Sequence, residues 1–572
     1  MVDSITTEVI RHSMLSAADE MARNLCRTSY NTIVYEIHDY GIGLHDPDGN
    51  TIAETPGVAI FSGANDFGVK KTKEFVGVEN MAPGDVFMLN YPYWSAAHTL
   101  DVLVLCPVFA DDTLIGFASC RCHLLDLKQK DAGYVLDSTD MAQEGIFFPA
   151  VKIYEAGRER SDILNIIRFN SRLPERTIGD LQAEVSAVHT GDVRLREIAA
   201  KYGTATLLAA MDEINNHGER LSRAAVARLP KGTWTATDYI DTDGINLRDR
   251  VPLTVTVTVE DDRMIIDWTA VDKGVAGPIN VPAGLTAAGS RLAFKALTTP
   301  DTPICAGNFR NLEVRTMPGT LMHAEPPMPT FTLWTGLFVP EVVTKALSQG
   351  LTGVVPACSG GDVCCVMALG VNPRSGAFWL EATNDAVGFG AHAGGDGADG
   401  VMHVTEPGCR NNPVEVLENK GPMIIDEYAF RADSGGPGKH RGGVGIVRAY
   451  RFLAPTNAIV INYKTRTAPW GVDGGRDGVK NSVVVGRGTA DEREVGVSDT
   501  PFQAGGTIVN LTGGGGGWGD PFERDPALVA EDVRQGFVSP ERARSDYGVA
   551  VDPVGFVVDE AATTGLRAAG AS

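Results

Sequence analysis

Two copies of one tetrad offer the side chains best suited to chemistry. They are His98-Thr-Leu-Asp101 and His123-Leu-Leu-Asp126. The stretch between them holds two apolar, β-branched runs, residues 102–109 and 114–122, on either side of Asp111-Asp112. This pattern predicts an antiparallel hairpin whose turn lies at the two aspartates and whose open end carries both tetrads.

Pairing about that turn brings the two tetrads together. Opposed residue numbers would sum to about 223, which places Asp101 opposite Cys122 and His123 one step beyond, close to His98. Cross-strand neighbours lie about 5 Å apart, near enough for two imidazoles to share one metal ion. A hydrogen-bonded His–Asp pair explains either tetrad alone, but two copies at matched ends of one hairpin favour a metal site.

The ligand types narrow the choice of metal. Imidazole with carboxylate, without thiolate, suits one divalent ion such as Zn, Mn, Fe or Co. Cys120 and Cys122 lie in the same predicted strand and would be further ligands if they faced the site. Their i, i+2 spacing directs both to one face of the sheet, so packing is the simpler role for them.

A third protein ligand is expected from an earlier stretch. Residues 32–44 (TIVYEIHDYGIGL) alternate like a strand and carry Asp39. A carboxylate in an apolar strand is costly to bury unless it is paired or binds a metal; the alternative is a strand-end side chain that faces water. With His98 and His123, Asp39 would leave coordination positions open for water or substrate, as catalytic metals require.

Three further carboxylates are candidates for catalysis, namely Asp101, Asp126 and Glu144. Asp101 or Asp126 would orient a ligating imidazole, and either would also serve as a general base. Glu144 follows in the segment STDMAQEG and would act from behind the ligands. The sequence thus predicts a ligand set and a supporting set of carboxylates.

The elements around this site predict an α+β protein. Apolar spacing over residues 5–26 predicts a first helix, capped by Ser4 or Thr6, and residues 161–227 predict a run of helices. Alternation over residues 234–271 predicts paired strands. The helix-rich N-terminal part would therefore carry the metal hairpin, and β-structure would dominate later.

The chain of 572 residues is too long for one core, so it is expected to form several domains. Proline and glycine at residues 229–232 indicate the first boundary. The predicted domains are residues 1–229 with the metal site, residues 230–425 with mixed α+β structure, and residues 426–572, which are β-rich and glycine-dense with a short helical tail.

Two glycine-rich loops lie in the last domain: residues 435–445 (GGPGKHRGGVG) and 513–519 (GGGGGWG). Neither contains the GK[ST] of a nucleoside-triphosphate loop. Neither opens a helix with an acidic residue about 20 positions later, as dinucleotide loops do. Backbone turns and strand crossings explain these glycines, and anion binding is the alternative.

Composition excludes several classes of partner. The net charge of −22 argues against nucleic acid and anionic membranes. The nine cysteines are odd in number and form no CxxC pair, as expected for reduced thiols in the cytoplasm. The N-terminus lacks a secretion signal, and no apolar run approaches the roughly 20 residues that span a bilayer. We therefore expect a soluble, cytoplasmic protein.

Many short motifs of this chain occur in the same order in a known family. They are EVIRH, CRTSYNTIVYEIHDY, PGDVFMLNYPYW, HTLDV, RCHLLD, EGIFFPAVKIY, GDLQAE, GPIN, DTPICAGNFR, NPVEVLE, RADSGGPGKHRGGVGIVR and GGGGGWGDPFERDP. Through them the full length of the chain resembles the hydantoinase B family. Members are the smaller subunits of ATP-dependent hydantoinases, 5-oxoprolinases and lactamases, and they also occur in acetone and acetophenone carboxylases.

The resemblance implies a metal site with these ligands: Asp39, His98 and His123, with Asp101 adjacent. It also implies that ATP and Mg bind to a separate hydantoinase A-like subunit in an (αβ)2 heterotetramer, which agrees with the lack of a nucleotide loop here. Many members have a second His where this chain has Leu124, and a Gly-Gly where it has Lys128-Gln129. These departures concern the rim of the site, and hence the substrate, rather than the ligands.

The function expected from this resemblance is ATP-dependent opening of a cyclic amide. The partner would phosphorylate the substrate oxygen or make carboxyphosphate from bicarbonate, while the metal would polarise the carbonyl or hold bicarbonate or water. The alternative is a subunit of an acetone- or acetophenone-type carboxylase, in which the same metal would stabilise an enolate. A third possibility is a scaffold for the hydantoinase A-like partner that binds no metal.

Overall fold

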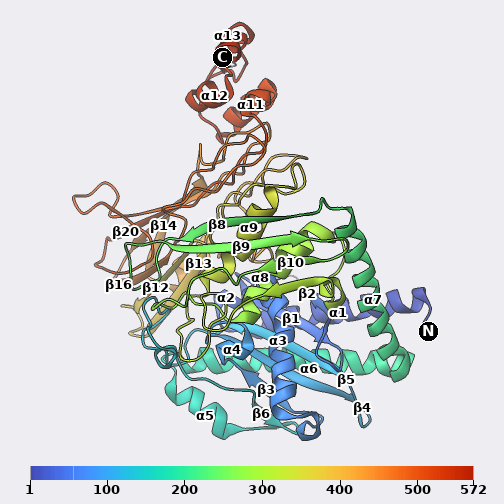
Figure 1. Ribbon diagram of the computed structural model, residues 1–572. Helices are drawn as coiled ribbons and strands as arrows, with labels where there is room; N and C mark the ends of the chain where they lie inside the picture. Colours follow the sequence, from blue (N-terminus) through green and yellow to red (C-terminus); the bar gives the residue numbers. More distant parts are fainter. Residues whose placement is uncertain (1, 56, 571–572) are drawn as a thin grey trace.

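The computed structural model describes residues 2–55 and 57–570, which form an α+β protein, as predicted (Figure 1). The α-helices are α1 Ser4–Thr28, α2 Thr32–Tyr35, α3 Ala59–Val76, α4 Pro92–Ser95, α5 Ser161–Asn170, α6 Pro174–Tyr202, α7 Thr204–Arg228, α8 Ala283–Thr298, α9 Trp334–Ser348, α10 Val414–Lys420, α11 Pro526–Gln535, α12 Pro540–Tyr547 and α13 Glu560–Gly570. The 3-10 helices are η1 Val78–Asn80, η2 Met141–Gln143, η3 Ala306–Phe309 and η4 Pro521–Glu523.

The strands lie in four sheets. They are β1 Tyr40–His45, β2 Thr51–Thr55, β3 Val86–Leu89, β4 Asp101–Ala110, β5 Thr113–His123, β6 Val151–Glu155, β7 Arg158–Glu159, β8 Gly232–Ile240, β9 Val251–Val259, β10 Met264–Asp267, β11 Leu312–Arg315, β12 Cys365–Val371, β13 Phe378–Asn384, β14 Met423–Phe430, β15 Ile446–Phe452, β16 Thr456–Ile461, β17 Ser482–Val485, β18 Arg493–Val495, β19 Ser498–Phe502 and β20 Thr507–Leu511. The sheet orders are β2-β1-β5-β4-β3-β6-β7, β11-β10-β9-β8, β13-β12-β16-β19 and β14-β15-β20-β17-β18.

The first sheet carries the predicted hairpin at its centre, as strands β4 and β5. Helices α1 and α6 pack together against it, and α3 also packs on it and on α8. Helix α8 packs in turn on α9, and α9 packs on β8 and β9 of the second sheet. The N-terminal half is thus layered, and its apolar side chains join one continuous core cluster.

The third and fourth sheets share a second apolar cluster and form a sandwich. Alternation along β12 explains how the third sheet serves two cores. Val366 and Ala368 belong to the sandwich, whereas Cys365 and Met367 belong to the main cluster on the opposite side. The third sheet therefore also presents side chains to the first half of the molecule.

The hairpin forms where the sequence predicts it, but its register differs by one residue. Near the turn, Phe109 pairs with Leu114, as a sum of 223 requires. A bulge between Val108 and Phe109 then shifts the pairing, so that Asp101 lies opposite His123 and not opposite Cys122. An extra residue in one strand is not readable from alternation alone, because a bulge is stabilised by its neighbours in the sheet.

Two local predictions were wrong in part. Residues 32–44 were expected to form one strand, but residues 32–35 are helical in α2 and the strand begins only at Tyr40. Between them His38 has a φ of 65°, a left-handed conformation that interrupts both elements. Helix α1 is capped by Asp3, whose carboxylate accepts from the Thr6 N–H, and not by Ser4 or Thr6.

The C-terminal region is more elaborate than the predicted short helix and tail. Residues 521–570, the C-terminal lobe, contain the 3-10 helix η4 and three α-helices, with an apolar cluster of their own. Long extended segments lead from the body to this lobe (Figure 1). The predicted division into residues 1–229, 230–425 and 426–572 stays a prediction. In the described part of the chain, every helix is too short or too polar to cross a membrane.

Candidate metal centre

Asp101 is the centre of a buried His–Asp–His cluster. Its Oδ1 lies 3.2 Å from His98 Nε2 and 3.0 Å from His123 Nδ1. One ligand atom from each of the three side chains lies within 4.8 Å of the other two, a spacing that one metal ion bridges. Sequence reasoning placed Asp101 beside the ligands; the structure places it between them.

Adjacent strand ends bring these side chains together. Strands β1, β5 and β4 are neighbours, and Asp101 begins β4 opposite His123, which ends β5. A tight turn closed by the Asp101 N–H and the His98 carbonyl, 3.0 Å apart, folds His98 back over the end of β4. The repeated tetrad therefore converges, as predicted, because the hairpin closes its own open end.

Asp39 arrives at the same place from the start of β1. Tyr40 pairs with Cys122, so the preceding residue lies beside His123, and the His123 N–H donates to the Asp39 carbonyl at 3.4 Å. The Asp39 carboxylate lines the same cavity as the cluster, and its Oδ1 is buried with no hydrogen-bond partner among the described residues. The expected alternative, a strand-end carboxylate that faces water, does not fit this placement.

The electrostatics of the cluster follow from burial and from the carboxylates. Burial lowers the pKa of His98 to about 3, so its imidazole is neutral and able to ligate. Burial also opposes protonation of His123, but the hydrogen bond and charge of Asp101 outweigh it and raise that pKa. Burial raises the pKa of Asp39 to about 7. Burial thus disfavours the ionised form of Asp39, and a bound cation would favour it.

Glu406 is a member of this cavity that sequence reasoning missed. It comes from a loop after β13, is buried, and accepts a 3.1 Å hydrogen bond from the Asn384 amide. Burial first, and then the charges of Asp39 and Asp101, raise its pKa well above the usual range. A single Glu in a loop gives no spacing signal, so only the fold identifies it.

Aromatic side chains close the cavity over the cluster. The Phe331 ring lies 5.1 Å from the His98 ring, and the Tyr134 ring stacks at 6.5 Å on His123. Trp334 packs edge-on against Tyr134 at 5.6 Å and is fixed by its indole N–H, which donates to the buried Asp362. The remaining space is about 50 Å3, room for an ion and a few water molecules.

Two of the predicted catalytic carboxylates do not line this cavity. Asp126 accepts from the backbone N–H of Arg172 and, at 2.6 Å, from its guanidinium. Glu144 accepts from the Ser138 hydroxyl at 2.8 Å and from the N–H groups of Thr330 and Phe331. Both therefore hold loops in place, and Glu144 holds the loop whose Phe331 covers His98.

The residues present fit a divalent metal. Two imidazoles and the Asp101 carboxylate converge, Asp39 lines the same cavity, and the buried oxygens Asp39 Oδ1 and Asp101 Oδ2 lack a hydrogen-bond partner among the described residues. Buried carboxylate oxygens are costly to leave unpaired, so they identify a place for a cation. Cys120 and Cys122 are buried free thiols outside the cluster; Cys122 lies 2.6 Å from Glu184, which supports the packing role.

Comparison with known proteins shows the family of the chain. The family model described as Hydantoinase B/oxoprolinase matches residues 3–521. The chain belongs to this family. It is 32% identical to a protein of Pseudomonas sp. (strain NS671) named as the B-type subunit of a D-/L-hydantoinase, over 96% of this chain and 95% of that one. It is 30% identical to the beta subunit of the caprolactamase of Pseudomonas jessenii, over 99% of each chain.

Longer relatives and solved structures extend the comparison. The 5-oxoprolinase of Dictyostelium discoideum is 26% identical over 91% of this chain, which corresponds to 40% of that protein. The crystal structure of ATP-dependent caprolactamase from Pseudomonas jessenii superposes with a TM-score of 0.90 and 28% identity, over 99% of this chain and 100% of that one. A nucleotide-free acetone carboxylase structure shares the fold, with a TM-score of 0.90 at 18% identity over 100% of this chain and 83% of that one.

Proposed function

We propose that this family member is the metal-binding subunit of an ATP-dependent cyclic-amide hydrolase. One observation carries the proposal: His98, Asp101 and His123 converge in a small cavity that Asp39 also lines, and Asp39 Oδ1 has no hydrogen-bond partner in the described part of the chain. The relatives named as hydantoinase, caprolactamase and 5-oxoprolinase chains support a cyclic amide as the substrate class. In this proposal Asp101 is a metal ligand, whereas the sequence predicted a supporting role for it.

The chemistry divides between the ligands and the cavity wall. A divalent Zn, Mn, Fe or Co held by Asp39, His98, Asp101 and His123 would polarise the amide carbonyl as a Lewis acid. Glu406 lies on the wall outside the His–Asp–His cluster, where its carboxyl group is placed to exchange a proton with the substrate. Asn384, which donates to Glu406, fixes the orientation of that carboxyl group.

Asp126 and Glu144 are proposed as positioning residues. Glu144 fixes the backbone N–H groups of residues 330 and 331, and through Phe331 it fixes the ring that contacts His98. Asp126 ties the segment after β5 to Arg172 at the start of the helical region. Each acts through its neighbours rather than on the substrate.

The size of the cavity limits what reaches the cluster. Its volume of about 50 Å3 admits a bicarbonate-sized molecule but not a lactam ring. A cyclic amide therefore requires the aromatic wall at Tyr134 and Trp334, the first residue of α9, to move outward. Exclusion of water by these aromatic rings would protect an activated substrate once the wall had closed.

Activation is assigned to a partner. A hydantoinase A-like subunit would bind ATP and Mg and would phosphorylate the substrate or make carboxyphosphate from bicarbonate, within an (αβ)2 heterotetramer. Two relatives of nearly equal length are named as subunits, which supports a separate chain of this kind. The nine cysteines are free, which fits a cytoplasmic location for the assembly.

A measurement of bound metal tests the proposal. Inductively coupled plasma mass spectrometry of the purified chain is expected to give about one equivalent of a divalent metal. His98→Ala and His123→Ala are each expected to lose the metal and the turnover with the partner, while circular dichroism stays unchanged. His189→Ala, which changes an exposed histidine on α6, is the matched control and should keep both. Full activity in His98→Ala would refute the metal centre.

The small volume of the cavity also supports a second candidate, a subunit of an acetone- or acetophenone-type carboxylase. A small ketone and bicarbonate fit the available space more readily than a ring does, and an acetone carboxylase shares the fold. Turnover of lactam versus ketone plus bicarbonate, with ATP and the partner present, distinguishes the two. Carboxylation without lactam hydrolysis would replace the first proposal by the second.

A further inference from the structure

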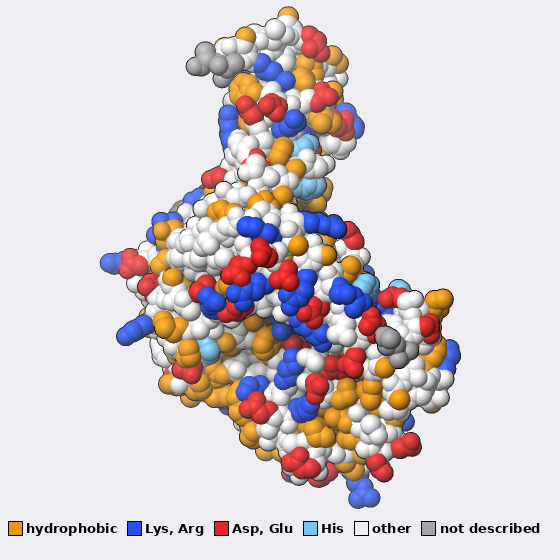
Figure 2. All heavy atoms as spheres, turned by 45° about the vertical axis from the view of Figure 1, so that its right-hand side comes forward, with side chains coloured by type: hydrophobic (Ala, Val, Ile, Leu, Met, Phe, Trp, Pro, Cys, Tyr) orange, Lys and Arg blue, Asp and Glu red, His pale blue; other side chains and the backbone are white. Residues whose placement is uncertain are grey.

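The C-terminal lobe stands away from the body on glycine-rich segments. Figure 2 shows it joined to the body by a narrow neck, and Figure 1 shows that extended chain segments form this neck. Its apolar cluster, with Val529, Val533 and Tyr547 among its members, is separate from the main core. The lobe therefore contributes no side chain to the metal cavity, and its role must be sought elsewhere.

The neck, which comprises residues 388–399, 434–445, 469–479 and 513–520, is built for close contact between backbones. The N–H of Gly515 donates to the Gly443 carbonyl at 2.9 Å, and the N–H of Gly388 donates to the Gly513 carbonyl at 2.9 Å. A Cβ on Gly515 would lie 1.9 Å from the Phe389 carbonyl oxygen, which no side chain tolerates. The glycine loops thus serve backbone packing rather than anion binding, and they form a rigid support.

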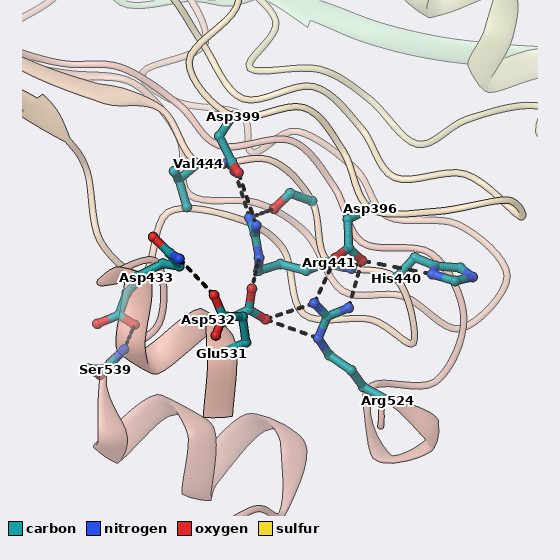
Figure 3. A network of polar contacts seen from close by, with 12 residues as sticks. Asp396, Asp399, Asp433, His440, Arg441, Val444, Arg524, Glu531, Asp532 and Ser539 are labelled. Carbon is teal, nitrogen blue, oxygen red and sulfur yellow. Dashed lines mark hydrogen bonds and ion pairs between the residues drawn. The ribbon is translucent and has the colours of Figure 1, made fainter. Parts of the chain in front are cut away.

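A buried ion network locks the lobe onto this neck (Figure 3). Arg524, from the lobe, makes two bonds of 2.6 and 2.7 Å to Asp396 of the neck. Arg441, from the neck, donates to Asp532 of the lobe at 3.2 Å and to Asp399. Bidentate arginine–carboxylate pairs fix orientation as well as distance. The lobe is therefore held at a set angle.

The lobe presents an apolar tip to solvent. Val551 and Val558 form a β-bridge, and between them Val554 and Val557 are 84% and 65% exposed. Asp552 orders this turn, because its carboxylate accepts from the Val554 N–H at 3.1 Å and its N–H donates to the Val557 carbonyl at 2.9 Å. A preformed, apolar, projecting turn has the properties of a protein-binding element.

The extent of similarity to known relatives differs between relatives of this length and longer ones. The family model ends at residue 521, where the lobe begins. The beta chain of the caprolactamase aligns over 99% of this chain, a share too large to leave the lobe out. The 5-oxoprolinase aligns over 91%, the share that the family model spans, and this match occupies 40% of one long chain. The lobe thus accompanies relatives named as subunits, whereas in the long chain the matched region is covalently attached to the remainder.

We propose that the tip at residues 551–558 docks the separate ATP-binding subunit and replaces the covalent link of the long-chain relatives. The inference rests on the proposed function, because it needs such a partner to exist. A long-chain enzyme holds its parts together by the backbone, whereas separate chains require a contact that survives dilution. An ordered apolar turn on a rigid lobe supplies that contact at low entropic cost.

Binding of the purified hydantoinase A-like protein of the same organism tests the proposal. The double variant Val554→Asp, Val557→Asp is expected to weaken binding at least about tenfold, since two desolvated anchors are lost. Phe169→Asp on α5, which changes a side chain that is 83% exposed, is the matched control and should bind like the wild type. Metal content should stay the same in all three proteins, because none of the changes lies near the cavity.

A covalent rescue completes the test. Fusion of the partner to the double variant through a flexible linker is expected to restore turnover, because the linker raises the effective concentration. Equal affinity of the double variant and the wild type would overturn the docking proposal and leave the metal proposal standing. If the metal-loaded wild type does not bind the A-like protein at all, the proposed partner falls, and the docking proposal falls with it.

Discussion

Two buried clusters of charge in this molecule are satisfied to different degrees. In the network between neck and lobe, every guanidinium nitrogen of Arg441 and Arg524 donates to a carboxylate. In the metal cavity, Asp39 Oδ1 and Asp101 Oδ2 lack a partner among the described residues. The buried Arg121 donates to the Asn65 amide oxygen and to a carbonyl rather than to these carboxylates.

The difference separates a structural role from a functional one. Completely paired charges fix two parts of a fold relative to each other, and no unpaired charge remains to bind a ligand. Unpaired buried carboxylates cost stability unless a cation completes them. The cavity is therefore predicted to be stabilised by metal, whereas the network is predicted to be insensitive to it.

Removal of a cation from the satisfied network should have the largest effect. Arg524→Ala leaves the buried Asp532 with Arg441 alone and leaves the partly exposed Asp396 without a guanidinium donor, and we expect the free energy of opening of the lobe to fall by about 3–5 kcal/mol. Hydrogen exchange in α11 measures that free energy. The control is Arg534→Ala, which removes an exposed ion pair with Glu531 on the same helix. Similar exchange in the two variants would contradict the structural role.

Glu144 is intermediate between the paired carboxylates of the network and the unpaired ones of the cavity, because neutral donors satisfy it without a cation. Burial raises its pKa to about 7 from an ordinary 4.5, so its contribution to stability is complete below pH 4.5 and is lost as pH rises through 7. The loss amounts to about 3 kcal/mol. Glu144→Gln keeps an acceptor oxygen without the charge, so unfolding free energies at pH 5 and pH 8 should differ less than in the wild type. A variant that follows the wild type at both pH values would refute this.

Removal of an unpaired carboxylate should have the smallest effect and the opposite sign. The metal-free Asp39→Asn variant is expected to be about 1–2 kcal/mol more stable than the metal-free wild type at pH 8, because a buried charge without a partner is gone. The same variant should gain no stability from added metal. Denaturant titration with and without metal measures both effects. Asp532→Asn, from the satisfied network, should be less stable than the wild type with and without metal. If both variants changed the unfolding free energy in the same direction, the proposed difference between the two clusters would be wrong.

Local pattern was sufficient to predict the hairpin and the meeting of its two histidines. The apolar runs, the Asp111-Asp112 turn and the repeated tetrad lie within 30 consecutive residues, and antiparallel neighbours must close their own open end. The helices at residues 161–227 and the strands after residue 232 were also predicted, because their periodicity is strong. The family followed from motifs in the same order along the chain.

Tertiary structure alone decided the composition of the site. One bulge moved Asp101 from opposite Cys122 to opposite His123, and the packing of distant loops brought Glu406 to the cavity. Asp126 and Glu144 found donors elsewhere. The neck and its lobe likewise depend on backbone contacts between segments far apart in sequence. Sequence determined which side chains were able to ligate, and the fold decided which carboxylates remained unpaired, because hydrogen-bond satisfaction depends on every neighbour in space.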